Sequence, residues 1–365
     1  MMKVALLSDA SSIHTIRWVN GLSTAGLHLH VITQQLPCDP VDEDVVLHQF
    51  PNGGNLGYFL MVPAVRKLLK QIKPDIVNAH YASGYGTAAR LVNYRPYLLS
   101  VWGSDVYNFP HKSIMHNYLV RRNLLAADKV ASTSYCMAEE TRKLAPELRD
   151  IAITPFGVDM QQYQTAQPAE SDDSRPIVIG TVKTMAPNYG ISTLLQAFAL
   201  LRNKYLEDSP DLEKRLQLRL VGGGPQLQEL KALAFTLGLD ACTEFVGRVP
   251  HEKVPEELSK LDIYVALSES ESFGVAIIEA GAAARPVVVS NAGGLPEVTV
   301  DGVTGIVVPK NNPAAAAEAI ERLVLDAELR VRMGLAGRLH VAENYSWTAS
   351  IQQMISVYES MVERV

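Results

Sequence analysis

Short runs of apolar residues alternate along this chain with longer segments in which apolar residues recur every three or four positions. Short apolar runs are typical of buried strands, and the wider spacing is typical of amphipathic helices. In the first half, strands are expected at residues 3–7, 29–33, 76–78, 97–101, 129–132 and 152–154, with a first helix over 14–25 and further helical segments between the strands. Strands that alternate with helices predict a parallel sheet covered by helices.

The same alternation begins again near residue 177. Strands are expected at 177–180, 216–221, 244–246, 263–265 and 286–289, and helices over 191–206, 226–237, 254–261, 313–326, 327–343 and 350–363. Residues 165–176 are polar and contain proline, which is typical of a linker. A chain of 365 residues is also longer than a single core usually becomes. The sequence therefore predicts two Rossmann-like α/β domains, at 1–160 and 177–345, with a linker at 161–176 and a terminal helix within 346–365.

Composition is that of an ordinary soluble globular protein, with 47% hydrophobic and 20% charged residues. The three cysteines, Cys38, Cys136 and Cys242, are far apart and lack the spacing of metal ligands, which favours a reducing compartment. The apolar run at 4–7 is too short for the core of a signal peptide, and no run is long enough to cross a membrane. We therefore expect a cytoplasmic protein.

Charge is unevenly distributed along the chain, whose net charge is −6. Residues 1–160 hold 15 Lys and Arg against 13 Asp and Glu, and the remainder holds 18 against 26, so the two parts carry +2 and −8. The acidic second part argues against nucleic acid as the main partner. Basic residues of the first part gather in two amphipathic stretches, 58–73 and 111–122. These predict either contact with the anionic inner face of the cytoplasmic membrane or the solvated faces of ordinary helices, and the sequence leaves both open.

Two glutamates separated by seven residues mark the most informative segment, E-S-F-G-V-A-I-I-E from Glu271 to Glu279. An apolar helical run follows the Phe-Gly turn, so Glu271 is expected just before a helix and Glu279 about two turns into it. A buried strand and the glycine-rich loop 291–297 come next, which completes one unit of an open α/β sheet. Such sheets bind ligands beyond the carboxyl ends of their strands. Both carboxylates can then reach a ligand that lies across the helix N-terminus, where free N–H groups also suit phosphate.

The residues around this pair extend the pattern: Leu267-Ser268 precede it, Gly-Gly-x-x-Glu follows at 293–297, and Asp301-Gly302 come before Thr304-Gly305. In this order they resemble the E-x7-E signature of the retaining glycosyltransferases of family 4, and the resemblance extends over nearly the whole chain. It implies the GT-B fold, in which two Rossmann-like domains face each other across a cleft and the last helix returns to the first domain. It also implies transfer of a sugar from a nucleotide diphosphate sugar to a glycan or lipid-linked acceptor. The variants at 102–105 and 189–190 resemble those of bacterial members that build surface polysaccharides.

The resemblance assigns most of the donor site to the second domain. Glu279 would accept hydrogen bonds from the ribose hydroxyls, which suits a carboxylate with two oxygens. Glu271 would bind hydroxyls of the transferred sugar, beside the backbone N–H groups of Phe273 and Gly274. The remaining donor-binding positions are Ser272, Arg248, Val249, Gly223 and Gly224.

The departing diphosphate must be stabilised by positive charge or by oriented N–H groups. In the family, an Arg and a Lys from the first loop of the second domain hold the phosphates. Here that loop supplies Lys183, which we assign with Glu271 to the catalytic pair, whereas Tyr189 stands where a Lys is usual. Arg248 is the candidate to replace the missing charge, whose loss would cost about 1.5–3 kcal/mol. No cofactor or metal is expected: the acidic triplet Asp42-Glu43-Asp44 lies in a polar stretch typical of a surface loop, with metal binding as the lesser alternative.

The first domain contributes Trp102 and Asp105, in the segment S-V-W-G-S-D at 100–105. This segment resembles the family's His-Gly-x-Asp, with Trp102 in place of the His that contacts the transferred sugar. Trp can donate a hydrogen bond or stack on a sugar but cannot move protons, so Trp102 is assigned to shaping the pocket. Asp105 either orients this loop or caps the following helix. His14, at the start of the first helix, and His80, expected at the cleft rim after a buried strand, complete the acceptor side as structural or acid–base groups.

No side chain is placed as a covalent nucleophile. Retention is therefore expected to follow the same-face attack usually described for this family, in which the leaving phosphate oxygen helps to take the acceptor proton. Two alternatives remain. A nucleotide-sugar epimerase on the same fold would need no acceptor. A non-catalytic partner subunit would tolerate Trp102, Tyr189 and Ser11-Ser12, which replace the family's His, Lys and Gly-Gly, but the intact Glu271 and Glu279 favour an enzyme.

Overall fold

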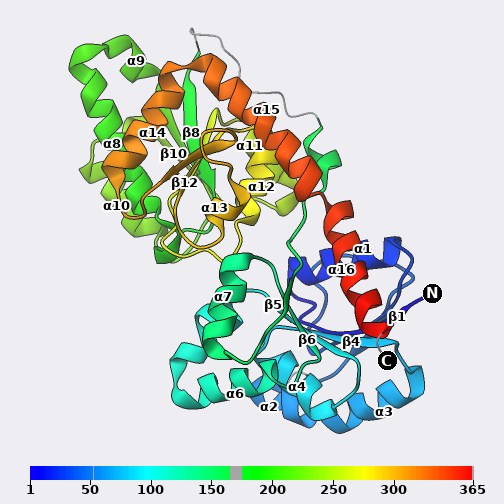
Figure 1. Cartoon of the computed structure of the whole chain (residues 1–365). Coiled ribbons are helices and arrows are strands. Elements are labelled where there is room, and N and C mark those ends of the chain that lie inside the picture. Colours follow the sequence, from blue (N-terminus) through cyan, green and yellow to red (C-terminus); the bar gives the residue numbers. More distant parts are fainter. Residues whose placement is uncertain (52, 165–174, 364–365) are drawn as a thin grey trace. The chain divides into compact units, whose positions relative to one another are not determined.

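The computed structural model describes residues 1–51, 53–164 and 175–363 (Figure 1). The chain divides into two compact units. Unit 1 comprises Met1–Pro155 together with Trp347–Val365, and unit 2 comprises Phe156–Ser346. Most of the linker expected at 161–176 lies outside the described residues, because residues 165–174 are among those not described. Each unit has a sheet and a hydrophobic core of its own.

Unit 1 is built on a parallel sheet of seven strands in the order β3-β2-β1-β4-β5-β6-β7. The strands are β1 (Lys3–Leu7), β2 (His28–Thr33), β3 (Val46–Gln49), β4 (Ile76–His80), β5 (Tyr97–Val101), β6 (Lys129–Ser132) and β7 (Ile151–Ile153). Every residue of β4 and β5 is buried, as parallel strands covered on both faces require. The strand order reverses between β1 and β4. Ligands of open α/β sheets bind at such a reversal, beyond the carboxyl ends of the strands.

Helices cover the sheet of unit 1 on both faces (Figure 1). They are α1 (Ile13–Thr24), α2 (Gly54–Leu60), α3 (Val62–Ile72), α4 (Gly84–Val92), α5 (Ser104–Tyr107), the 3-10 helix η1 (Phe109–Lys112), α6 (Ile114–Leu124), α7 (Tyr135–Leu144) and α16 (Trp347–Val362). Helices α2, α3 and α4 lie together on one side of the sheet, and α1 and α16 lie on the other.

The terminal helix α16 packs on unit 1, against α1 and β4. The rings of Trp18 and Trp347 meet edge to face, with centroids 5.2 Å apart. Asn78 Nδ2 in β4 donates a hydrogen bond of 2.9 Å to the Tyr358 hydroxyl, and both side chains are fully buried. The return of the last helix to the first Rossmann-like unit, which the resemblance implied, is confirmed.

Unit 2 contains the second parallel sheet, with six strands in the order β10-β9-β8-β11-β12-β13. The strands are β8 (Ile177–Val182), β9 (Leu216–Val221), β10 (Thr243–Gly247), β11 (Ile263–Ala266), β12 (Val287–Ser290) and β13 (Gly305–Val308). The helices are η2 (Met160–Tyr163), η3 (Pro187–Tyr189), α8 (Ile191–Asp208), α9 (Pro210–Arg215), α10 (Leu227–Thr236), η4 (Asp240–Cys242), η5 (His251–Lys253), α11 (Val254–Ser259), α12 (Val275–Ala282), α13 (Leu295–Val298), α14 (Pro313–Leu325) and α15 (Ala327–Asn344). The strand order reverses between β8 and β11, so the loops after these two strands lie at the second expected ligand-binding point.

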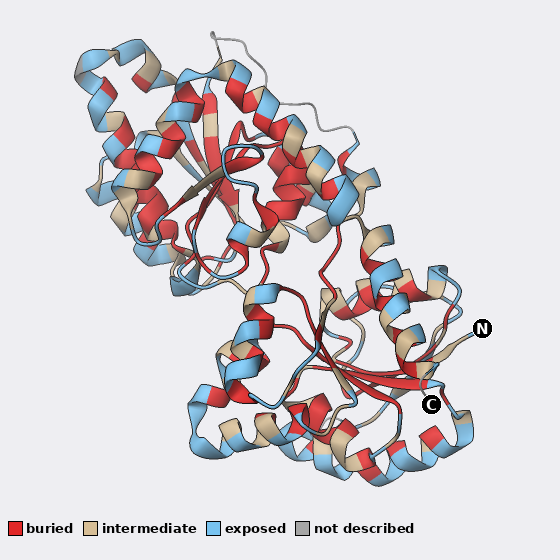
Figure 2. Ribbon diagram, viewed as in Figure 1, coloured by how far each residue is buried: buried red, intermediate tan, exposed pale blue. Residues whose placement is uncertain are grey.

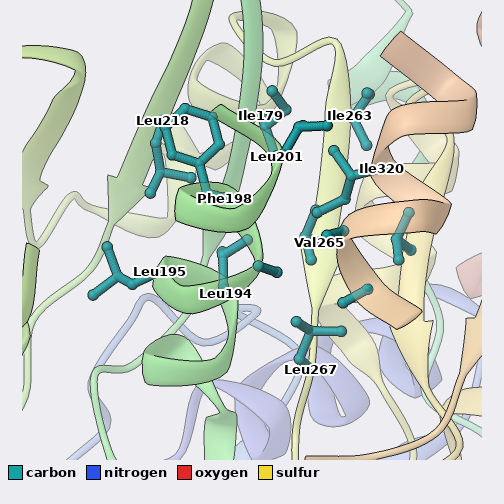
Figure 3. Packing of buried hydrophobic residues seen from close by; sticks show 14 of the residues in the cluster. Ile179, Leu194, Leu195, Phe198, Leu201, Leu218, Ile263, Val265, Leu267 and Ile320 are labelled. Carbon is teal, nitrogen blue, oxygen red and sulfur yellow. The ribbon is translucent and has the colours of Figure 1, made fainter. Parts of the chain in front are cut away.

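The core of unit 2 holds α8 against the sheet (Figure 3). Leu194, Phe198 and Leu201 project from one face of α8 and are at most 2% exposed. They pack in one cluster with Ile179 of β8 and Val265 of β11. Burying each such side chain stabilises the fold by about 1.5–3 kcal/mol. The core therefore fixes the two central strands from which the loops of the candidate site emerge.

Two strands, β3 and β13, are not predicted by the apolar pattern. Both lie at the edge of their sheet, where a strand has one neighbour and more contact with water. In β3, Val46 and Leu47 are 39% and 36% exposed, so no buried apolar run marks the strand. Among the residues that the structure describes, none of the helices combines the length and apolar character that crossing a bilayer requires.

Candidate functional site

Lys183 and Glu271 come from the loops that follow β8 and β11, the strands at the reversal point of unit 2. Lys183 Nζ lies 2.6 Å from Glu271 Oε2, and the two side chains are 15% and 13% exposed. Burial disfavours the charged form of Lys183, but the carboxylate of Glu271, together with Tyr264 and Tyr189, more than offsets this effect, so the pKa of Lys183 is raised. The ammonium therefore stays charged in a place that water reaches little.

The ring of Tyr189 supports this ammonium from a second direction. Tyr189 ends η3, in the same loop as Lys183, and is half-buried. Lys183 Nζ lies 4.5 Å from the centroid of the Tyr189 ring, within the range of a cation–π contact. Tyr189 therefore does not replace the charge of a second lysine, but it holds the first one in position.

The segment that begins α12 is fixed from several sides. Gly274 is the N-cap, with φ 108°, a left-handed conformation in which a side chain would be strained. The Phe273 ring is buried, with its centroid 5.7 Å from that of Tyr345. The N–H of Gly294 donates a hydrogen bond of 2.9 Å to the carbonyl oxygen of Glu271. These contacts set the position of the helix N-terminus, whose first N–H groups lack partners within the helix and suit an anion.

Glu279 lies in the second turn of α12 and is 8% exposed. His251, in η5 after β10, approaches it, with Nε2 3.7 Å from Glu279 Oε1. His251 was not among the site residues predicted from the sequence. Its position soon after Arg248-Val249, which were already assigned to the donor site, was the available signal. A carboxylate oriented by a neighbouring imidazole is suited to accept hydrogen bonds from a pair of hydroxyls.

The glycine turn after β9 packs tightly against the Lys183 loop. Gly222 has φ 139°, and a Cβ at this position would overlap the carbonyl oxygen of Lys183. A Cβ at Gly224 would overlap the carbonyl oxygen of Met185 in the same way. The N–H of Met185 donates a hydrogen bond of 3.0 Å to the carbonyl oxygen of Gly223. The turn thus sets the backbone of the loop that carries Lys183.

Arg248, in the loop after β10, borders the same turn. Its side chain is exposed, and its Cγ would lie 2.9 Å from a Cβ built on Gly223. A side chain at 223 would therefore displace the guanidinium stem. Val249 follows it and is half-buried. Arg248 can add a positive charge at this edge of the sheet, as the sequence analysis required of it.

The predicted donor residues lie at the carboxyl ends of the strands of the unit 2 sheet. The loops after β8, β9, β10 and β11 carry, in turn, Lys183; Gly223 and Gly224; Arg248 and Val249; and Glu271, Ser272, Phe273 and Gly274. All of these loops emerge at the same end of the sheet, because the four strands are parallel neighbours. Ser272 is half-buried within this set. The arrangement brings two carboxylates, two cations and a helix N-terminus to the carboxyl ends of the strands.

In unit 1, the carboxylate of Asp105 organises the loop after β5. It is 1% exposed and accepts hydrogen bonds from the N–H groups of Ala82 at 2.7 Å, Trp102 at 3.2 Å and Gly103 at 2.9 Å. Burial raises the pKa of Asp105, and these hydrogen bonds oppose part of the rise. The N-cap of α5 is Gly103. Of the two roles that the sequence left open, Asp105 therefore has the loop-orienting one.

Trp102 is held between two aromatic neighbours. Its ring centroid lies 4.0 Å from that of His80 and 5.2 Å from that of Tyr81, which meets it edge to face. Tyr81 was not among the site residues predicted from the sequence. It has φ 68° and turns the chain at the end of β4. Trp102 is 7% exposed, so these three rings form a closely packed cluster near the reversal point of the unit 1 sheet.

The expectation that His80 lies at the rim of a cleft is wrong. His80 is 1% exposed, and its Nδ1 lies 2.9 Å from the hydroxyl of Ser8. Burial lowers the pKa of His80 to about 3, so the imidazole is neutral near neutral pH. His80 is therefore a buried hydrogen-bonding group whose ring packs against that of Trp102. His14 lies in the first turn of α1, where it was expected, and is half-buried.

Two family models match the chain. The model for glycosyl transferases of group 1 matches residues 163–340, which include the whole predicted donor set. The model for glycosyl transferase 4-like proteins matches residues 3–134, which include Trp102 and Asp105.

Curated relatives are similar to the chain over different shares of their length. The D-inositol 3-phosphate glycosyltransferase of Corynebacterium jeikeium is 31% identical over 224 residues, which are 58% of this chain and 52% of the relative. The chain thus spans about half the length of this relative and of similar ones from other species. An uncharacterized glycosyltransferase of Methanocaldococcus jannaschii is 24% identical over 92% of this chain and 90% of its own length.

Solved structures share the fold over the full chain. A sucrose-phosphate synthase from Thermosynechococcus elongatus has a TM-score of 0.81 at 21% identity, with 100% of both chains covered. Anabaena HepE, solved in complex with UDP, has a TM-score of 0.79 at 17% identity, with 98% of this chain and 100% of that chain covered. The two Rossmann-like units and the returning helix are thus the GT-B fold.

Proposed function

The chain belongs to the group 1 family of glycosyl transferases, and we propose that it transfers a sugar from a nucleotide diphosphate sugar to a hydroxyl group of a glycan or lipid-linked acceptor. The observation that carries this proposal is the pair of Lys183 and Glu271, 2.6 Å apart, at the N-terminus of the helix that holds Glu279. A cation for phosphate and two carboxylates for hydroxyls are what a nucleotide sugar requires.

The nucleotide is assigned to the part of the site formed by Glu279 and His251. Glu279 accepts hydrogen bonds from the ribose hydroxyls, and His251 lies beside its carboxylate, with Nε2 3.7 Å from Oε1. The HepE complexes with UDP and with UDP-glucose support a nucleotide sugar as the donor. Burial strengthens these hydrogen bonds. Glu279 is 8% exposed, so water competes little with the ligand for its carboxylate oxygens.

The diphosphate is assigned to Lys183, Arg248 and the N-terminus of α12. As the bond to the sugar breaks, negative charge builds on the phosphate oxygens, and positive groups that are already in place stabilise it without reorganisation. Lys183 is such a group, because Glu271 and Tyr189 fix its ammonium. We propose that these charges supply the stabilisation that a divalent metal supplies in other glycosyltransferases, so that no metal is required.

The transfer step is proposed to retain the configuration of the sugar. The bond between C1 and the phosphate oxygen breaks while a bond from C1 to the acceptor oxygen forms on the same face. The acceptor proton passes to the departing phosphate oxygen, so atoms and charge balance. Glu271 orients the sugar through its hydroxyls, which places C1 for this attack. Trp102, backed by His80, shapes the acceptor side.

A transfer assay tests this function. The protein is incubated with candidate nucleotide sugars and a panel of lipid-linked and free glycans, and the anomeric proton of the product is followed by NMR. We expect a product of unchanged anomeric configuration, formed equally with EDTA, and a loss of rate of at least about a hundredfold in Glu271→Gln. An inverted product would contradict the retaining mechanism. A free epimer formed without acceptor would instead assign the chain to the epimerases.

A further inference from the structure

Two helices of unit 1 carry large apolar residues that are exposed to solvent. Exposed positions along the ribbon are pale blue in Figure 2. In α6, Ile114, Met115 and Tyr118 are 90%, 81% and 60% exposed. In α2, the exposed side chains are Leu56 at 70%, Phe59 at 47% and Leu60 at 74%. Each set follows the spacing of one helix face, so neighbouring members present a continuous apolar stripe to solvent.

These side chains are not needed for the packing of their own helices. The opposite side of α6 is anchored by Asn123, whose Nδ2 donates hydrogen bonds of 2.8 Å to Ala82 O and to Thr87 Oγ1. The opposite side of α2 is anchored by Tyr58, whose ring meets that of Tyr85 edge to face at 5.0 Å. Both α2 and α6 contact α4, so the two stripes belong to the same layer of helices. The exposed stripes are therefore surplus to the core.

The charge around the stripes is strongly one-sided. Residues 54–127, which contain α2 to α6, hold nine Lys and Arg and only two acidic residues, Asp75 and Asp105, in a chain of net charge −6. Asp105 is buried, so it does not offset the surface charge. The basic side chains on the exposed surface of this layer include Lys67, Lys70, Lys112 and Arg122.

One of these cations, Arg122, lies directly beside an apolar stripe residue. The guanidinium of Arg122 lies 5.9 Å from the ring centroid of Tyr118, one helical turn away. Arg121 of α6 forms an ion pair with Glu147, whereas none of the ion pairs within the described part of the chain includes Lys67, Lys70, Lys112 or Arg122. Tyrosine and arginine each combine an apolar body with a polar end, as is typical of side chains that sit at a lipid–water interface.

We propose that this surface, made of Leu56, Phe59, Leu60, Ile114, Met115, Tyr118, Lys67, Lys70, Lys112 and Arg122, docks on an anionic lipid bilayer. Exposed apolar stripes enter the boundary between headgroups and acyl chains, and the cations meet the negative headgroups. A nucleic acid would use the cations but not the aliphatic stripes, and an ordinary solvated helix face would carry charges of both signs. Docking would bring the protein to the membrane that holds a lipid-linked acceptor, and in this respect it rests on the proposed function. The docking itself does not depend on sugar transfer.

Sedimentation with vesicles tests the docking. The full chain is mixed with vesicles of phosphatidylglycerol and phosphatidylcholine in equal parts, or of phosphatidylcholine alone. We expect saturable binding to the anionic vesicles only. Lys112→Gln with Arg122→Gln should lower the partition coefficient about twenty-fivefold, from about fivefold for each lost charge. Ile114→Ser with Met115→Ser should lower it about tenfold or more.

Matched controls lie on unit 2. Phe235 and Leu339 are 73% and 65% exposed, so Phe235→Ser with Leu339→Ser removes comparable apolar area elsewhere and should leave vesicle binding unchanged. Equal losses in this control and in the Ile114 variant would overturn the proposal. A second outcome would also overturn the proposal: the wild type forms dimers and does not bind vesicles, and the variant Ile114→Ser with Met115→Ser is monomeric. That outcome would assign the surface to a second copy of the chain. Calorimetry with nucleotides on the same samples separates a failure of docking from a failure of the donor site.

Discussion

Lys183 depends on two neighbours for its place in the site. Glu271 supplies the opposite charge at 2.6 Å, and the ring of Tyr189 supplies a polarised face at 4.5 Å. The sequence alone identified Tyr189 as a departure from the family pattern. It could not predict the contact, because the approach of the ring depends on how η3 turns the loop back toward β8.

Replacing Tyr189 should therefore weaken phosphate binding. Tyr189→Ala removes a partly buried cation–π contact worth about 1–2 kcal/mol, so the dissociation constant of the preferred nucleoside diphosphate should rise about five- to thirtyfold. Tyr189→Phe keeps the ring and should bind within about twofold of the wild type. Titration calorimetry measures both. Equal affinities for the Ala and Phe variants would show that the ring does not position Lys183.

Three histidines on neighbouring strands of unit 1 make its stability dependent on pH. His30 Nδ1 lies 2.9 Å from His48 Nε2, and the ring of His28 lies 4.9 Å from that of His30. Burial first, and then the nearby charges of His48, His28 and Lys3, lower the pKa of His30 to about 4. In the unfolded chain, an imidazole has a pKa of about 6.5.

The unfolded state therefore binds more protons than the folded state between these two values, and unit 1 should lose stability as the pH falls from about 6.5 to about 4. The three tryptophans, Trp18, Trp102 and Trp347, all lie in unit 1, so their fluorescence reports its unfolding alone. Urea midpoints measured from pH 7.5 to pH 4.5 should fall, and the fall should be smaller in His30→Gln. The same slope in both proteins would assign the effect to other groups, such as His80.

At the level of helices and strands, the sequence predicted the central strands of both sheets. Of the edge strands it predicted β7 and β10 but missed β3 and β13. The ranges expected at 97–101, 129–132 and 216–221 are those of β5, β6 and β9, because buried parallel strands are short continuous apolar runs. None of the residues of the edge strand β3 is buried, so this strand leaves no such signal. The packing of α16 was expected only through the resemblance, since an amphipathic helix does not specify which surface covers it.

The contact between α16 and β4 should contribute measurably to the stability of unit 1. Tyr358→Phe keeps the ring but leaves the buried Asn78 amide without its acceptor, which should cost about 1–3 kcal/mol. Urea unfolding followed by tryptophan fluorescence measures this loss. Tyr118→Phe, which removes the hydroxyl of an exposed tyrosine, is the control and should change the free energy of unfolding by less than about 0.5 kcal/mol. A neutral Tyr358→Phe would mean that α16 is held by apolar contacts alone.

Taken as a whole chain, the molecule places one set of polar groups at the strand ends of each unit. The motif residues Glu271, Glu279 and Lys183 could be found from the sequence because their spacing and loop positions are specific. Tyr81 could not, because it contributes through Trp102, which is distant in sequence. For His251, the sequence offered only its position soon after Arg248-Val249. His80 was placed wrongly because a strand end does not reveal whether its side chain is covered.

Binding of nucleotides with and without metal tests the proposed donor site most directly. UDP, GDP and ADP are titrated by calorimetry into the wild type and Glu279→Gln, in EDTA or in Mn²⁺. We predict saturable binding of one nucleotide in EDTA, of unchanged affinity in Mn²⁺, and weakened about tenfold or more in Glu279→Gln through the loss of a charge-assisted contact to ribose. Binding that requires Mn²⁺, or equal binding by the variant, would contradict the assignment, and no binding of any nucleotide would indicate a non-catalytic partner subunit.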